Sequence, residues 1–185
     1  RLAKMVNDML WLAQSEHGLL KPVWESLGMA QEVRKLFDFF EALAEEKHIQ
    51  LMLEGQAPKI KGDRAMLRRA MSNLLSNAIR HSPEGESVKV RLDVSDEGQV
   101  LLSVQNTGSE IPAEHLPRIF DRFYRVDPSR QRQSEGAGLG LAIVKSIVEA
   151  HYGSIDVSSD YGMTSFSICF PQAAINWDCE EGALP

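Results

Sequence analysis

The sequence has few cysteines, no long apolar run and no excess of positive charge. It holds two cysteines, Cys169 and Cys179, in 185 residues, too few for a disulfide framework or a four-ligand zinc site. No stretch approaches the roughly 18–20 apolar residues of a membrane-spanning helix, and no signal peptide opens the chain. Its 20 Lys and Arg against 26 Asp and Glu give a net charge of −6, which argues against nucleic acid as a partner.

The composition is that of an ordinary globular protein. Apolar residues make up 43% of the chain and charged residues 25%, enough to bury a core without covalent cross-links. Since roughly 100–200 residues form one domain, we expect one core and one appendage. The chain begins with Arg1 and is expected to be a piece of a longer protein.

Hydrophobic periodicity predicts interleaved helices and strands. Helices are expected over residues 1–17, 28–47, 63–81 and 138–152, with a helical turn near 114–120. Strands are expected over 49–53, 57–60, 88–94, 100–104, 154–158 and 164–170. Asp63 is a typical N-cap, and the turn residues at 95–98 predict a hairpin. The period of two over 88–94 predicts that Val94 points inward. Because neighbouring strands are hairpin-linked, we expect a mixed two-layer sandwich, not a doubly wound parallel sheet.

The predicted organisation has four parts. Residues 1–17 form an amphipathic helix, 18–26 a linker, 27–171 the main domain, and 172–185 a disordered tail. An apolar helix stripe needs a partner, and no second helix of this type follows, so the partner of the first helix is expected upstream or on another chain.

Three segments carry side chains suited to an anionic ligand. Asn73, Asn77, Arg80 and His81 share one helix stripe, and an amide oxygen is a hard ligand suited to Mg²⁺. On this helix alone, capping or bridging of neighbouring loops is the favoured interpretation. The glycines at 136, 138 and 140 open a helix whose amides could meet phosphates, although a Gly-x-Gly-x-Gly pattern alone also suits a flexible hinge. Five arginines between 112 and 135 fit either a closing loop or a solvated charge run.

The order of these motifs resembles the ATP-binding domain of sensor histidine kinases, within the wider gyrase, Hsp90 and MutL type of ATPase. The resemblance covers residues 1–171 and rests on LRRAMSNLLSNAIRHS, VQNTGSEI, IFDRFYRVD, GAGLGLAIVKSIVEAHYG and GMTSF. It implies an α+β two-layer sandwich in which a mixed, mostly antiparallel sheet packs on three helices. It also implies that residues 1–17 are the second helix of a dimerisation hairpin.

The resemblance further implies a site for ATP and Mg²⁺. Asn77 would bind Mg²⁺ beside Asn73, and Asn106 would accept from the adenine amino group in the place of the family's usual Asp. Residues 112–135 would form a lid over the nucleotide, anchored by Phe120 and Phe123. The other implied nucleotide-binding residues are Arg80, His81, Gly108, Arg125, Arg130, Gly136, Gly138, Leu139, Gly140 and Thr164. Among these, Arg125 and Arg130 would join Asn77 in catalysis, at the phosphates.

The implied activity is transfer of the γ-phosphoryl group to a histidine, for relay to a response regulator. None of the five histidines matches the family's phosphoacceptor pattern, so the acceptor helix is expected elsewhere in the same protein. Asn73 stands where related ATPases have a glutamate base, which predicts poor ATP hydrolysis. A degenerate regulatory module, an ATP-hydrolysing clamp and a plain dimerisation module are the alternatives.

The run HLPRIFDRFYRVDPSRQR, together with Asn106, resembles the heavy-metal (copper or silver) sensor kinases. The resemblance implies a cytoplasmic domain of a membrane-anchored homodimer in the bacterial inner membrane.

Overall fold

A five-stranded sheet forms one layer of the protein. The structure is a computed structural model and describes residues 2–126 and 137–171. The sheet contains β2 (Gln50–Gly55), β4 (Ser87–Val94), β5 (Val100–Thr107), β6 (Ser154–Asp160) and β7 (Met163–Phe170), in the order β2-β4-β5-β7-β6. Only β2 and β4 pair in parallel, and the other neighbours are antiparallel. The predicted mixed, mostly antiparallel sheet is therefore confirmed.

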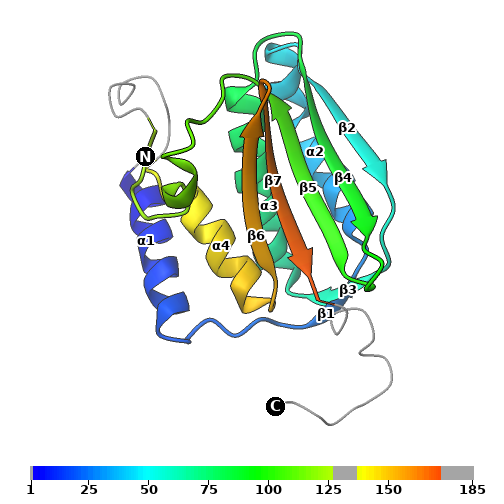
Figure 1. The fold of residues 1–185 in the computed structure, drawn as a ribbon. Helices are drawn as coiled ribbons and strands as arrows, with labels where there is room; N and C mark the ends of the chain where they lie inside the picture. Colours follow the sequence, from blue (N-terminus) through cyan, green and yellow to red (C-terminus); the bar gives the residue numbers. More distant parts are fainter. Residues whose placement is uncertain (1, 127–136, 172–185) are drawn as a thin grey trace.

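Three helices cover one face of this sheet (Figure 1). They are α2 (Met29–Glu46), α3 (Arg64–His81) and α4 (Gly140–Ala150), and the core lies between them and the sheet. Its largest fully buried side chains include Leu74, Leu75, Ile143, Phe166 and Phe170. No helix in the described part of the chain is both long and apolar enough to cross a membrane.

Local signals in the sequence place several boundaries correctly. Asp63 caps α3 by accepting from the Met66 amide at 2.9 Å, and the turn before Gln99 joins β4 to β5 as predicted. The expectation that Val94 points inward is wrong, since this residue is 40% exposed. Val94 is the last residue of β4 and lies beyond Leu92, where the pairing with β2 ends, so it has a neighbouring strand on one side only.

Two short strands differ from the prediction: β1 (Glu25–Leu27) is not expected from the sequence, and β3 (Ile60–Gly62) begins at Ile60, where the strand expected over 57–60 ends. β1 pairs antiparallel with β3, so residues 25 and 26 of the predicted linker belong to a strand. Three-residue strands are too short to show a period of two. The helical turn expected near 114–120 is the 3-10 helix η1 (Leu116–Arg118).

The first helix, α1 (Leu2–Glu16), has a partner within this chain. It lies beside α4 (Figure 1), Leu12 is buried, and the Ser15 and Ser146 hydroxyls are 2.5 Å apart. Arg69 of α3 forms an ion pair with Asp8 and stacks over Trp11. The expectation that the partner of α1 lies upstream or on another chain is therefore wrong for the face of α1 that contains Leu12. A second apolar stripe, Leu2, Val6, Met9 and Leu10, remains exposed.

A buried histidine joins the start of α3 to the end of α4. His151 Nδ1 lies 2.7 Å from the Ile147 carbonyl oxygen, and the Asp63 amide donates to His151 Nε2 at 2.9 Å. Because a carbonyl only accepts, Nδ1 carries the proton and Nε2 accepts, so the ring is neutral. Trp24 packs edge-on against this ring. The Val23 amide donates to Asp63 Oδ2 at 2.8 Å, so the segment after α1 is fixed at the same place.

Mild acid is expected to weaken the fold through His151. Burial lowers the pKa of His151, against smaller opposing effects of its bond to Ile147 and of the Asp63 charge. The unfolded chain then binds a proton near pH 6.5 while the folded chain does not, so stability is lost as the pH falls below that value. Glutamine can keep both hydrogen bonds but does not titrate. We therefore expect the free energy of unfolding to fall between pH 7 and 5.5 by about 1 kcal/mol less in His151→Gln than in the unsubstituted chain. Urea unfolding at both pH values measures this, and equal losses would contradict it.

Candidate nucleotide site

The middle of α3 faces the first turn of α4. The Asn73 Nδ2 donates to the Gly140 carbonyl at 3.4 Å, and a Cβ at Gly140 would lie 3.7 Å from the Asn73 amide. Asn77 is one turn further along α3, about 6 Å beyond this contact, and is half-buried. Its amide therefore lies ahead of the N-terminus of α4, where unpaired main-chain amides collect.

The start of α4 is shaped to receive an anion. The first hydrogen bond of the helix joins the Ile143 amide to the Leu139 carbonyl, which leaves the preceding amides free. These amides and the helix dipole favour a phosphate there. Leu139 itself is buried in the core, so only its main chain can face a ligand.

Gly138, which follows the predicted lid, is hydrogen-bonded to Phe123 within it. The Phe123 amide donates to the Gly138 carbonyl at 2.9 Å, and Gly138 has φ of +71°. A Cβ at this position would meet Phe123 main-chain atoms at 2.8 and 2.9 Å. Glycine is therefore required by both the backbone conformation and the close approach.

The buried face of the sheet ends in a polar pair. Asn106 of β5 and Thr164 of β7 are direct cross-strand partners, and both are buried. The Asn106 Nδ2 donates to the Thr107 carbonyl at 3.0 Å. Since a carbonyl cannot donate, this bond fixes the amide orientation and leaves Oδ1 as the acceptor for a ligand amino group.

Ser159, a residue that the sequence did not single out, supports this pair. Its hydroxyl accepts from the Ile111 amide at 2.9 Å and lies 2.9 Å from the Thr164 hydroxyl. The chain of bonds connects Thr164 to the segment that leads into the predicted lid. A serine on a strand carries no sequence signal for such a role.

Gly108 brings two loops close to the end of α3. Its amide donates to the Gly162 carbonyl at 2.9 Å, and a Cβ at Gly108 would lie 2.7 Å from the His81 carbonyl oxygen. The Asn106–Thr164 pair, Gly108 and the last turn of α3 therefore adjoin one another. Arg80 and His81 are exposed at that turn.

The two predicted lid anchors differ. Phe120 packs edge-on against the core residue Phe166, with ring centroids 6.2 Å apart. The Phe123 side chain is 52% exposed, so its described contact is the main-chain bond to Gly138. Arg125 is half-buried. Arg130 and Gly136 lie outside the described residues.

The oxygen ligands at this site suit a metal ion that is also bound by phosphate. Among residues 2–126 and 137–171, no group of three or more His, Cys, Asp or Glu could hold a metal ion. The amide oxygens of Asn73 and Asn77 are hard ligands, and Mg²⁺ typically takes one or two protein oxygens together with phosphates and water. Asn77 is the better placed, because it lies one turn beyond the start of α4, whereas the bond from the Asn73 Nδ2 directs that side chain toward Gly140.

Comparison with known proteins identifies the family. Residues 62–174, more than half of the chain, match the family described as histidine kinase-, DNA gyrase B- and HSP90-like ATPase. The chain belongs to this family. The match contains the Asn73–Asn77 stripe, the Asn106–Thr164 pair and the glycines that open α4, so the fold around the site is that of a histidine-kinase ATP-binding domain.

Relatives and solved structures agree with this assignment. The chain is 56% identical over 171 residues to the sensor histidine kinase CusS of Escherichia coli K12, covering 92% of this chain and 35% of that protein. It is 48% identical to the probable sensor kinase SilS of Salmonella typhimurium, with 93% and 35% covered. It therefore spans about a third of these relatives' length.

Among solved structures, full-length ShkA in complex with AMPPNP matches with a TM-score of 0.81 and 28% identity over 92% of this chain and 35% of that one. The mycobacterial sensor histidine kinase MprB matches with a TM-score of 0.68 and 30% identity, over 80% and 97%. The recognition of a sensor histidine kinase made from the sequence is thereby confirmed.

Proposed function

We propose that this domain binds ATP with Mg²⁺ and donates the γ-phosphoryl group to a histidine on a separate helix of the same protein. The observation that carries the proposal is the meeting of Asn73 with Gly140, which places Asn77 ahead of the free amides of α4. The phosphates would lie at that helix end, and the adenine between Asn106 and Thr164. Asn77 would be the protein ligand of Mg²⁺, which would neutralise phosphate charge when bound.

The domain's contribution to the reaction is positioning and charge neutralisation. An imidazole nitrogen attacks the γ-phosphorus, the bond to the bridging oxygen of ADP breaks, and the imidazole proton passes to solvent. Arg125 and Arg130 would approach the transferring group from the lid. Because Asn73 is not a base and is engaged with Gly140, water is poorly activated, which favours transfer to histidine over ATP hydrolysis.

Phosphoryl transfer can be tested by mixing. The chain is incubated with labelled ATP and Mg²⁺ and with a separately prepared phosphoacceptor hairpin from a related sensor kinase. We expect acid-labile label on the hairpin, none on a hairpin whose acceptor histidine is replaced by glutamine, and none with Asn77→Ala. Tight ATP binding without any transfer would favour the alternative, a degenerate regulatory module.

Asn106→Asp is expected to tighten ATP binding several-fold. A charged acceptor strengthens the bond to the adenine amino group by about 1 kcal/mol. The same change places an oxygen against the Thr107 carbonyl, which Asn106 now contacts at 3.0 Å, so the melting temperature without nucleotide should fall. Calorimetric titration with a non-hydrolysable ATP analogue, with Asn106→Ala as the weakened control, measures the affinity. An unchanged affinity in Asn106→Asp would refute the adenine role.

The full-length protein would be a membrane-anchored homodimer of the heavy-metal sensor class, located in the bacterial inner membrane with this domain in the cytoplasm. It would pass its phosphoryl group to a response regulator. The segment 115–132 and the identity to CusS and SilS support this part of the proposal. Residues 1–17 would be the second helix of the dimerisation hairpin, since α1 presents an exposed apolar stripe.

A further inference from the structure

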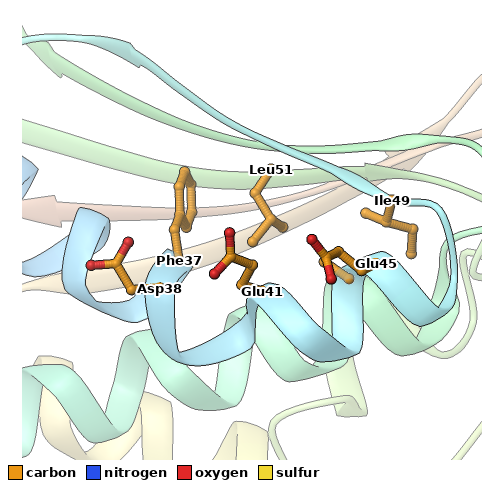
Figure 2. Close-up of a pocket in the computed structure, with 7 residues that line it drawn as sticks. Phe37, Asp38, Glu41, Glu45, Ile49 and Leu51 are labelled. Atoms are coloured by element: carbon orange, nitrogen blue, oxygen red, sulfur yellow. The ribbon is translucent and has the colours of Figure 1, made fainter.

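A groove lies between α2 and β2, at the edge of the sheet opposite β6 (Figure 2). Its floor is apolar and is formed by Phe37, Ala44, Ile49 and Leu51. The carboxylates of Asp38, Glu41 and Glu45 line it from α2. Its volume of about 260 Å³ is below the roughly 300–1,000 Å³ of small-molecule pockets, so it suits one or two side chains better than a whole cofactor.

The three carboxylates of the groove lack compensating charge. In the described part of the chain, none of them makes an ion pair or side-chain hydrogen bond, and Arg34, one turn before Asp38, forms no ion pair either. They follow one another at three- and four-residue spacing, where like charges repel. They also approach the C-terminal end of α2, where a helix dipole favours cations. The lysine at this end, the C-cap Lys47, donates to the Ile79 and Arg80 carbonyls of α3 instead. The groove therefore attracts positive charge.

The strand beside the groove has an open edge. β2 stands at the end of the strand order and, within the described residues, pairs only with β4. The Gln50 amide donates toward β4, to the Glu86 carbonyl at 3.0 Å. Main-chain groups alternate in direction along a strand, so those of Leu51 and Leu53 face the open edge. Within β2 there is no proline or lysine, the residues that commonly protect edges.

We propose that this groove docks an extended segment of a partner protein, in which an apolar residue is flanked by Lys or Arg two positions away on each side. The segment would add to β2 as a strand. Its apolar side chain would fill the groove over Leu51, and its cations would meet the carboxylates. Groove-facing residues four apart in a strand are about 13 Å apart, close to the roughly 10 Å between Asp38 and Glu45 on α2.

The negative charge of the groove favours a cationic peptide segment over other partners. Two copies of the groove would bring like carboxylates together, and nucleic acid or an anionic membrane would be repelled. The proposal does not depend on nucleotide chemistry, because no residue of the groove belongs to the nucleotide site.

A synthetic peptide can test the proposal directly. The probe is fluorescein-labelled TKTVTKT amide, measured by fluorescence anisotropy, with TETVTET as the charge-reversed control. We expect saturable binding of the first peptide and at least tenfold weaker binding of the second. Glu41→Lys should weaken binding of the first peptide at least tenfold. Glu46→Lys, which changes the same net charge on the same helix outside the groove, should leave binding within about twofold.

Backbone pairing has its own test. One version of the peptide is N-methylated at its odd-numbered residues and another at its even-numbered residues. The two should differ in affinity, since the main-chain amides of only one set face β2. Absence of saturable binding at millimolar peptide, equal effects of Glu41→Lys and Glu46→Lys, or equal binding of both methylated peptides would each overturn the proposal. Circular dichroism spectra and melting temperatures that match those of the unsubstituted chain confirm that both variants are folded.

Discussion

Asn77→Ala is expected to abolish the strengthening of ATP binding by Mg²⁺. Asn77 lies one turn beyond the contact between Asn73 and Gly140, ahead of the amides of α4, and its amide oxygen is the best-placed hard ligand there. Without it, Mg²⁺ would be held by the phosphates and water alone. We expect at least a tenfold loss of affinity for a non-hydrolysable ATP analogue when Mg²⁺ is present, equivalent to about 1.4 kcal/mol, and little change in its absence.

The matched control for this substitution is Asn77→Asp, which keeps an oxygen ligand and should retain the Mg²⁺ dependence. Titration calorimetry with and without Mg²⁺ measures all three proteins. Asn77→Ala should leave the melting temperature without nucleotide nearly unchanged, because the structure gives the Asn77 side chain no hydrogen bond to the rest of the described chain. If Mg²⁺ strengthened binding equally in Asn77→Ala, the assignment of Asn77 as the metal ligand would be wrong.

Glu32→Gln should destabilise the fold by about 3 kcal/mol at pH 7. Glu32 is only 2% exposed and lies between Arg64 Nη1 and Arg68 Nε, each 2.5 Å from one of its oxygens. Removing one member of a buried ion pair leaves the other charges uncompensated, which typically costs 3–5 kcal/mol. The lower end applies because both arginines are partly exposed and Arg64 also binds Glu25 at 2.7 Å.

The pH dependence separates lost charge from lost packing. Burial alone would raise the pKa of Glu32, but hydrogen bonds from Arg68 and Lys35 and the charges of Arg68 and Arg64 outweigh it and hold the pKa below its ordinary value. The stabilisation is therefore present above the ordinary pKa of a glutamate and is lost as the pH falls through the folded pKa. Urea unfolding should show the difference between Glu32→Gln and the unsubstituted chain shrinking from pH 7 to pH 3.5. A constant difference would mean that packing, not charge, accounts for the loss.

Local signals in the sequence predict most elements but not their partners. Asp63 fixes the start of α3, and the turn before Gln99 fixes a hairpin, because capping and turn formation depend on residues close in the chain. The parallel pairing of β2 with β4 depends on residues far apart in sequence, and no local pattern indicates it. The same holds for α1, whose apolar residues suggest a single stripe, whereas the folded helix divides them between α4 and solvent.

Within the site, residues on regular elements were predictable and supporting residues were not. The stripe of Asn73 and Asn77 follows from helical spacing. Ser159 becomes visible only when Thr164 and Ile111 are brought together by the fold. From the sequence alone, Glu32 is one of several charged residues expected on the solvent face of a helix. Its burial depends on the packing of α3, which brings Arg64 and Arg68 against it.

The bond between Asp63 and His151 has a mechanical consequence. It joins α3 and α4 at the end remote from the nucleotide site, at 2.9 Å, whereas the bond between Asn73 and Gly140 at the site end is longer, at 3.4 Å. Asp63 also caps α3 through the Met66 amide, so this one residue fixes the start of α3 both to its own first turn and to the end of α4. The segment that follows α1 is anchored at the same residue through the Val23 amide, so a displacement of α1 reaches the joined ends of α3 and α4 directly and is not absorbed by a free linker.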